Sequence, residues 1–198
     1  MLNRGAYSMR NKNSTEEQYI EDCLVDIIEY IGEDSVREGL LETPKRIRKS
    51  WDKLYGGYNM DPKELLKTFD KETYSQMVVL KDIEFYSTCE HHMLPFFGKA
   101  HIAYIPGKKV IGVSKLARLL EIYARRMQIQ ERIGEQVTTF LMKELKAKGA
   151  ACVLEAQHFC MTSRGVEKQN AKMVTSSLKG AFLKEPETRQ EFFSMIKG

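Results

Sequence analysis

Cys89, His92 and Cys160 stand out in this chain because their residue types and spacing suit a metal ion. Cys89 and His92 are three positions apart, so one turn of the chain can bring both side chains to the same ion. Thiolate sulfur and imidazole nitrogen are ligands that zinc prefers. Three protein ligands with an open fourth position are typical of a catalytic zinc site, whereas a structural site usually has four. The pattern therefore indicates a metal-dependent enzyme.

His158 lies two positions before Cys160, in an apolar run over residues 151–160 that predicts a strand. Residues i and i+2 of a strand point to the same face, so we expect His158 beside whatever Cys160 binds. His91 or His158 could instead complete the ligand set, which would make the metal structural. The spacing alone leaves both interpretations open.

The composition is ordinary for a globular protein and argues against several classes. The 198 residues are 42% hydrophobic and 29% charged, as in soluble domains. No apolar run approaches the ~20 residues that cross a bilayer, and residues 1–18 lack the apolar core of a signal peptide. We therefore expect a cytoplasmic protein with no membrane partner. The net charge of +4 suits an anionic small molecule, and no basic run interleaved with aromatic residues points to nucleic acid.

The hydrophobic pattern predicts a helical N-terminal region followed by a mixed domain. Residues 1–13 are expected to be a disordered tail. In the helical region, 14–72, capping or proline signals precede apolar residues at helical spacing. These signals place the expected helix starts at Ser14, at Thr43-Pro44 and at Asp61-Pro62.

Residues 73–198 show the order of two strands, two helices and two strands. Runs rich in β-branched and apolar residues predict strands at 77–86, 99–105, 151–160 and 172–178. Ser114 is expected to cap the first helix, and an apolar stripe from Ile129 to Leu145 marks the second. This order predicts an α+β domain in which an antiparallel four-stranded sheet carries a helix pair on one face.

Charged residues near these elements could bind an anionic ligand. Glu131 lies on the polar face of the second helix, where a solvated carboxylate is the default interpretation. Lys115 and Arg118 follow the helix start at Ser114, and Arg164 follows Cys160. Backbone N–H groups at a helix start, with Lys and Arg nearby, form an anion site, although each such residue alone is usually a surface charge.

Several ordered motifs closely resemble the GTP cyclohydrolase I family, over roughly residues 35–195. The motifs are Glu42-Thr43-Pro44-Lys45-Arg46, Ser87-Thr88-Cys89-Glu90-His91-His92, Tyr104-Ile105-Pro106, Val110-Ile111-Gly112-Val113-Ser114-Lys115-Leu116-Ala117-Arg118, Gln128-Ile129-Gln130-Glu131-Arg132, His158-Phe159-Cys160-Met161-Thr162-Ser163-Arg164-Gly165 and Thr175-Ser176-Ser177-Leu178-Lys179-Gly180. Because independent motifs occur in one order over most of the chain, the resemblance is specific.

The family converts GTP and water to 7,8-dihydroneopterin triphosphate and formate, the first step of tetrahydrofolate and pterin biosynthesis. The resemblance implies that Cys89, His92 and Cys160 hold Zn²⁺ with a water in the fourth position. The metal lowers the pKa of that water toward ~7, and the resulting hydroxide attacks C8 of the guanine ring. His91 is implied as the proton donor and acceptor at the purine nitrogen.

The resemblance also assigns substrate contacts. Glu131 is implied as the anchor of the guanine base, with Gln130 beside it, which replaces the solvated-carboxylate interpretation. His158 is implied in catalysis near the ribose and the metal, and Ser114 in catalysis at the triphosphate. The implied triphosphate-binding residues are Lys115, Arg118, Arg164, Arg46 and Lys49, together with Ser114.

The family has the tunnelling fold, in which the sheets of neighbouring subunits join side by side into a barrel. The resemblance therefore implies a toroidal homodecamer with active sites between subunits, and Arg46 is expected to serve a neighbour's site. Closure into a barrel would also remove exposed sheet edges.

Two other hypotheses remain open at this point. A non-catalytic module stabilised by zinc would have four protein ligands and no need for His91. A sister pterin or deazapurine enzyme of the same fold would act on another substrate, but the complete guanine and triphosphate motifs favour GTP.

Overall fold

The computed structural model describes residues 15–65, 68–70, 74–107 and 109–197. The chain divides into two compact units between Lys53 and Leu54. The domain boundary expected at residue 72 falls within residues 71–73, and the expected disordered tail within residues 1–14. Both segments lie outside the described residues, so these two expectations stay predictions.

The N-terminal unit is helical. Its two helices are α1 (Glu16–Tyr30) and α2 (Thr43–Leu54). The side chain of Thr15 caps α1 by accepting the backbone N–H of Gln18, whereas the expected cap, Ser14, lies outside the described residues. Within this unit, the guanidinium of Arg48 on α2 donates to the carboxylate of Glu21 on α1 at 2.6 Å. The start of α2 at Thr43 confirms the prediction from the Thr-Pro signal.

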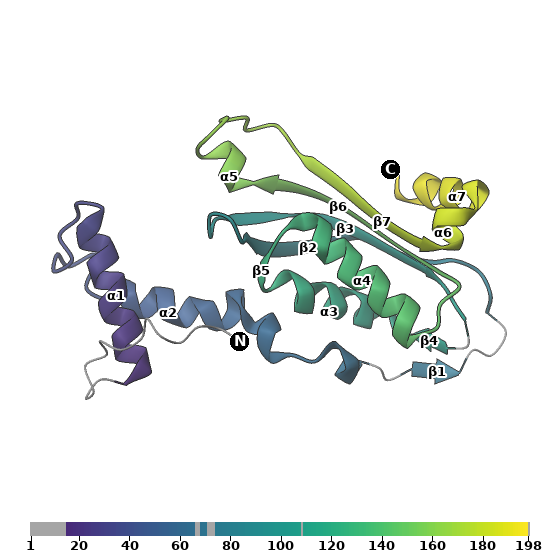
Figure 1. Cartoon of the computed structure of the whole chain (residues 1–198), viewed down its shortest axis with the longest axis horizontal. Coiled ribbons are helices and arrows are strands. Elements are labelled where there is room, and N and C mark those ends of the chain that lie inside the picture. The colour runs from purple at the N-terminus through teal and green to yellow at the C-terminus, as the bar shows by residue number, and fades with distance from the viewer. Residues whose placement is uncertain (1–14, 66–67, 71–73, 108, 198) are drawn as a thin grey trace, which may run out of the picture. The chain divides into compact units, whose positions relative to one another are not determined.

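Among the described residues, the second unit contains short 3₁₀ turns, seven strands and five helices. Figure 1 shows how the labelled strands and helices are arranged within this unit. The turns are η2 (Gly56–Asn59) and η3 (Pro62–Leu65). The strands are β1 (Thr68–Asp70), β2 (Val78–Cys89), β3 (Pro95–Ile105), β4 (Lys109–Ile111), β5 (Met127–Gln128), β6 (Gly149–His158) and β7 (Met173–Gly180). The helices are α3 (Val113–Ala124), α4 (Gln130–Glu144), α5 (Phe159–Thr162), α6 (Ala181–Lys184) and α7 (Pro186–Ile196).

Five of the strands form one sheet in the order β5-β2-β3-β6-β7. The pairs β2–β3, β3–β6 and β6–β7 are antiparallel, and the two-residue β5 runs parallel to β2. Strand β4 does not join this sheet but pairs with β1. The predicted antiparallel four-stranded sheet with α3 and α4 on one face is therefore confirmed, with β5 as an addition, and the class is α+β (Figure 1).

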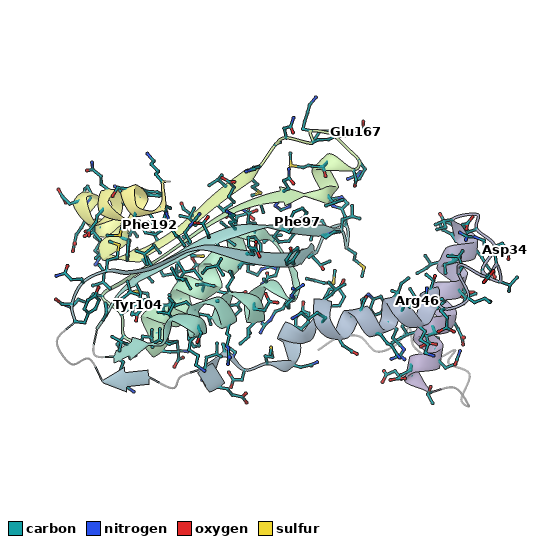
Figure 2. All side chains as sticks on the ribbon, turned by 180° about the vertical axis from the view of Figure 1, so that it is seen from behind. Asp34, Arg46, Phe97, Tyr104, Glu167 and Phe192 are labelled. Atoms are coloured by element: carbon teal, nitrogen blue, oxygen red, sulfur yellow. The ribbon has the colours of Figure 1, made fainter. Side chains whose placement is uncertain are left out.

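The main core lies between the sheet and the helix pair. Each of the two helices has buried apolar residues on one face, at the i, i+3, i+4 spacing, and this face packs against the sheet. The buried helix residues include Leu116, Leu119, Leu120, Ile133, Val137 and Leu141. A smaller core on the other face contains Phe182 and Phe192, whose rings meet edge to face at 5.5 Å. Figure 2 shows Tyr104, which belongs to the main core, on the opposite side of the sheet from Phe192.

Two local predictions were wrong. Strand β6 ends at His158, and Cys160 lies in the short helix α5. The last register pair of β6 is Phe96 with His158, and the next partner would be Pro95, which has no N–H to donate. The second concerns Ser114, which does not cap α3: the helix begins at Val113, and the extended Gly112 takes the N-cap position.

Strands β3 and β6 approach closely at Gly98. A Cβ atom added to Gly98 would lie 1.9 Å from the backbone oxygen of Glu155. Because that neighbour is backbone, the strands would have to separate. The absence of a side chain at this position therefore keeps the two strands in register next to the pair Phe96 and His158.

We expect Gly98→Ala to lower the free energy of unfolding by about 1–3 kcal/mol, the usual cost of overpacking. The measurement is the denaturant midpoint of the purified protein. Gly56→Ala is the matched control, because a Cβ at Gly56 meets no atom within 4 Å. A Gly98→Ala protein as stable as the control would contradict the close approach.

Candidate metal centre and adjoining pocket

The turn between β2 and β3 carries two of the candidate metal ligands. Strand β2 ends at Cys89, whose backbone N–H donates to the carbonyl of Leu94 at 2.8 Å. The N–H of Met93 donates back to the carbonyl of Cys89 at 2.9 Å, with Met93 at a positive φ of 54°. This tight turn therefore places His92 close to Cys89, the last residue of β2.

Cys89, His92 and Cys160 come together as the sequence predicted. One ligand atom from each lies within 4.8 Å of the other two. Cys89 is buried, Cys160 is half-buried and His92 is exposed, so the cluster opens toward solvent on the His92 side. The third ligand arrives from α5, directly after β6 ends.

The donor set fits a zinc ion. A zinc ion bonded at about 2.0–2.3 Å places its ligand atoms roughly 4 Å apart, which agrees with the observed spacing. Burial and the nearby sulfur of Cys89 raise the pKa of the Cys160 thiol. A divalent cation between the two sulfurs would reverse this effect by stabilising both thiolates.

Arg164 contacts the exposed side of this cluster. One of its guanidinium nitrogens lies 3.1 Å from Nε2 of His92. A guanidinium has only donors, so Nε2 of His92 accepts this hydrogen bond. Among the members of the predicted triphosphate set in the second unit, Arg164 is the one that the described residues bring to the metal-ligand cluster.

A cavity of about 280 Å³ adjoins the cluster. Its lining combines two candidate ligands with polar and apolar groups: Cys89, His91, Gln128, Ile129, Gln130, Glu131, His158, Cys160, Met161 and Met173. The ring of His91 is exposed, with Nδ1 at 3.9 Å from the sulfur of Cys89. The structure therefore gathers His91, Gln130, Glu131 and His158 around one opening, as the sequence predicted.

His158 is held at three points. Its ring stacks on Phe96 with centroids 4.5 Å apart and an interplanar angle of 6°. Nε2 lies 2.8 Å from Oε1 of Gln130, and Nδ1 lies 3.9 Å from the sulfur of Cys160. Burial lowers the pKa of His158, opposed by the carboxylate of Glu131. The predicted closeness to Cys160 is confirmed, but a helical turn produces it rather than a strand.

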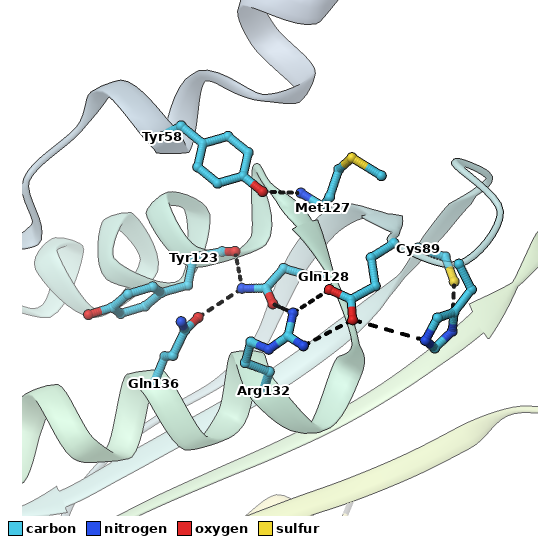
Figure 3. Close-up of polar contacts among 9 residues, drawn as sticks. Tyr58, Cys89, Tyr123, Met127, Gln128, Arg132 and Gln136 are labelled. Atoms are coloured by element: carbon cyan, nitrogen blue, oxygen red, sulfur yellow. Dashed lines mark hydrogen bonds and ion pairs between the residues drawn. The ribbon is translucent and has the colours of Figure 1, made fainter. Parts of the chain in front are cut away.

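A polar network connects the metal-binding turn to α4 (Figure 3). Arg132 forms a two-pronged ion pair with Glu90, one of whose bonds is 3.0 Å long. Hydrogen bonding to Arg132 lowers the pKa of Glu90. The amide of Gln128 extends the network by donating to the carbonyl of Tyr123 and to the side chain of Gln136.

The sequence alone indicated no role for Glu90, Gln128 or Arg132. The signal that was present is position: Glu90 stands between two predicted ligands, and Arg132 follows the predicted guanine anchor. Charge alone could not pair them, since 42 positions separate the two residues.

Three other predicted triphosphate residues of the second unit lie away from the metal-ligand cluster. Ser114, Lys115 and Arg118 lie in the first half of α3, whereas the end of α3 leads into β5, which pairs with Cys89. A helix of 12 residues is about 18 Å long, so these residues lie at the far end of the domain from the cluster (Figure 1). Arg46 and Lys49 are exposed on α2, in the N-terminal unit (Figure 2).

Three possible metal ligands beside a pocket with a carboxylate and two histidines form the arrangement expected of a catalytic site, and not of a closed structural zinc module. The profile of the family described as GTP cyclohydrolase I matches residues 20–197. The chain therefore belongs to the GTP cyclohydrolase I family. Within the described residues, no helix has the length and apolar character needed to span a membrane.

Named relatives agree with this assignment. GTP cyclohydrolase 1 of Wolinella succinogenes is 56% identical over 179 residues, covering 90% of this chain and 96% of the relative. The same-named protein of Campylobacter jejuni subsp. jejuni serotype O:6 is 51% identical over 181 residues, covering 91% and 95%. That of Chlorobaculum tepidum is 50% identical over 176 residues, covering 88% and 79%. A solved apo structure of the archaeosine synthase QueF-Like overlaps 55% of this chain and 97% of that chain, at 13% identity and a TM-score of 0.45.

We expect Arg132→Met to weaken zinc binding by about 10- to 100-fold, the usual cost of losing a group that orients a ligand-bearing segment. Without Arg132, the turn that carries Cys89 and His92 loses its anchor on α4. The measurement is competition for zinc with a chromophoric chelator. Lys179→Met is the matched control, because Lys179 pairs at 2.6 Å with Glu135 on the same helix and does not touch the turn. Equal losses in both variants would contradict a specific role for Arg132.

Proposed function

We propose that this chain converts GTP and water to 7,8-dihydroneopterin triphosphate and formate, as a cytoplasmic first step of tetrahydrofolate-type pterin synthesis. The observation that carries the proposal is that Cys89, His92 and Cys160 converge at a cavity which Glu131 and His158 also line. Membership in the GTP cyclohydrolase I family supports the choice of substrate. A structural zinc module would need neither the cavity nor the carboxylate.

Cys89, His92 and Cys160 are the residues that hold Zn²⁺ in this proposal. Bound there, zinc supplies the Lewis acidity that makes water nucleophilic near neutral pH. The buried sulfur of Cys89 fixes one ligand rigidly at the end of β2, while the exposed His92 leaves one side of the cluster accessible. This accessibility suits a site that must admit both water and a nucleotide.

His91 is the acid–base group for the purine nitrogen. It lines the cavity next to Cys89 but is not one of the three clustered ligands, so its ring is free to exchange protons with the substrate. A positioned acid–base group typically contributes about 10²–10⁴-fold to rate. The carboxylate of Glu90 lies 4.0 Å from Nε2 of His91.

Glu131 anchors the guanine base. Its carboxylate is exposed at the first turn of α4 and lines the cavity. An ionised carboxylate only accepts hydrogen bonds, and the N–H edge of guanine offers adjacent donors. A carboxylate at the opening would repel the triphosphate of GTP. Its pairing with the N–H donors of guanine explains why the pocket nevertheless contains one.

The triphosphate is bound by Lys115, Arg118, Arg164, Arg46 and Lys49, with Ser114 at the start of α3. No side chain caps the start of α3. The N–H of Lys115 donates to the carbonyl of Gly112 at 2.8 Å, and the positive end of the helix dipole favours an anion at this end. In one chain, however, this end of α3 is about 18 Å of helix from the end beside Cys89. The residues can act together only if the start of α3 serves the pocket of a neighbouring subunit.

The assembly proposed is a homodecamer in which tunnelling-fold sheets join into a barrel. Within the described sheet, β7 is an edge strand of eight residues, and such an edge is normally covered or paired. The single-chain cavity of about 280 Å³ lies just below the ~300–1,000 Å³ usual for small-molecule sites. A second chain that completes the pocket accounts for both features.

The decisive experiment is incubation of the purified, zinc-loaded protein with GTP. We expect formate and, after oxidation, a fluorescent pterin in equal amounts. Release of neither product would overturn the proposal. Turnover of a different purine in place of GTP would support a sister enzyme of the same fold instead.

The metal assignment predicts different behaviour for Cys160 and His91, two residues that line the same cavity. We expect Cys160→Ser to lose both zinc and activity, because a hydroxyl cannot replace a thiolate ligand without a severe loss of affinity. His91→Ala is the matched variant: it should keep zinc and lose about 10²–10⁴-fold in turnover. Elemental analysis and GTP kinetics test both. Full zinc retention in Cys160→Ser, or wild-type turnover in His91→Ala, would refute the corresponding role.

The shared-site proposal predicts complementation between two inactive variants. Lys115→Ala lacks a triphosphate contact, and Cys160→Ser lacks the metal site. After dissociation, mixing in equal amounts and reassembly, roughly a quarter of the pockets should receive both intact halves from different chains. Activity should therefore reappear in the mixed oligomer. If verified mixed oligomers of correctly folded parents stay inactive, Lys115 does not act across a subunit boundary.

A further inference from the structure

The side chain of Gln130 is buried and fully engaged by the protein. It is 1% exposed. Its amide nitrogen lies 3.0 Å from the carbonyl oxygen of Leu154, 3.1 Å from that of Met173 and 3.0 Å from the hydroxyl of Thr175. Its amide oxygen lies 2.8 Å from Nε2 of His158. Each polar atom of this amide therefore already has a protein partner.

The partners fix which way the amide points. Backbone carbonyls can only accept hydrogen bonds, so the nitrogen of Gln130 must face Leu154 and Met173. Reversing the amide would set its oxygen against two other oxygens in a buried site. The oxygen of Gln130 therefore faces His158, and because this oxygen can only accept, Nε2 of His158 must carry the hydrogen.

The second nitrogen of His158 faces the metal cluster. Nδ1 lies 3.9 Å from the sulfur of Cys160, and the stacking of the ring on Phe96 prevents it from tilting away. A neutral imidazole with its hydrogen on Nε2 has its lone pair on Nδ1. In its neutral form, His158 thus presents an acceptor, and not a donor, to the cavity that it lines.

We propose that Gln130 is a positioning residue that holds His158 in the Nε2–H tautomer and aims the lone pair of Nδ1 at the metal cluster and the substrate. The role in catalysis rests on the proposed function, whereas the tautomer itself does not. This assignment differs from the guanine contact that the resemblance implied for Gln130. To donate to the base, its NH₂ group would have to break a hydrogen bond inside the protein, because its two hydrogens already face Leu154, Met173 and Thr175.

Gln130→Met tests the proposal, because methionine keeps the length and apolar stem of glutamine and removes both hydrogen-bonding groups. Thr138→Val is the matched control. Thr138 is equally buried on α4 and forms a hydrogen bond of 2.8 Å with Ser177 on β7. Its hydrogen-bond partners among the described residues are Gly134, Glu135 and Ser177, and not His158. The control therefore reproduces the loss of a buried helix-to-sheet hydrogen bond without the proposed effect.

The direct readout is the tautomer of His158, from nitrogen NMR of protein labelled with ¹⁵N-histidine. The chain has only four histidines, and the signal that disappears in His158→Gln is that of His158. We expect the Nε2–H form alone in the wild type and in Thr138→Val, and a mixture of both tautomers in Gln130→Met. An Nδ1–H form of His158 in the wild type would overturn the proposal. An unchanged tautomer in Gln130→Met would do the same.

The kinetic readout separates positioning from substrate binding. We expect Gln130→Met to lower kcat by about 10- to 100-fold with little change in KM for GTP, and Thr138→Val to keep both parameters. A raised KM with unchanged kcat would show that Gln130 binds the base and would overturn the positioning role. If the wild type fails to turn over GTP, the proposed function fails, and the NMR result still decides whether Gln130 sets the tautomer.

Discussion

The antiparallel pairing of β3 with β6 is the constraint on which the candidate site depends. The pairing runs from Ile105 with Gly149 to Phe96 with His158, and it ends where Pro95 has no N–H to continue it. A slip of one residue would turn each side chain of the strand to the opposite face. His158 would then lose the ring of Phe96 and the amide of Gln130 at once. The close backbone approach at Gly98 strengthens this register beside the site.

The site occupies the end of the sheet at which regular hydrogen bonding stops. Both ligand-bearing segments, the turn with His92 and the helix α5 with Cys160, leave the sheet at this end. Neither segment belongs to a long element, so their geometry relies on anchors from elsewhere. The first turn of α4 provides these anchors.

The first three residues of α4, Gln130, Glu131 and Arg132, point in three different directions. Successive side chains of a helix project about 100° apart, so Gln130, Glu131 and Arg132 cannot share one partner. Gln130 bonds to His158, Glu131 lines the cavity and Arg132 pairs with Glu90. One helical turn thus connects both ligand-bearing segments while presenting a carboxylate to the opening. Substitution of Arg132 should therefore affect metal binding, substitution of Gln130 the tautomer of His158, and substitution of Glu131 the affinity for the substrate.

The sequence by itself determined the fold class, the four antiparallel strands, the helix pair and the three clustered ligands. Hydrophobic periodicity reports which face of an element is buried, and the Cys-His spacing within one turn is a local property of the chain. The ordered motifs also identified the family that residues 20–197 match.

Only the tertiary structure decided which partners the buried polar side chains choose. Glu90 meets Arg132 across 42 positions, and Gln130 meets His158 across 28. The separation of Ser114 from the metal cluster likewise follows from the direction in which α3 runs under the sheet. The physical reason is that periodicity describes the environment of a residue along its own element. A hydrogen-bond partner is selected by which distant segment the folded sheet brings within about 3 Å.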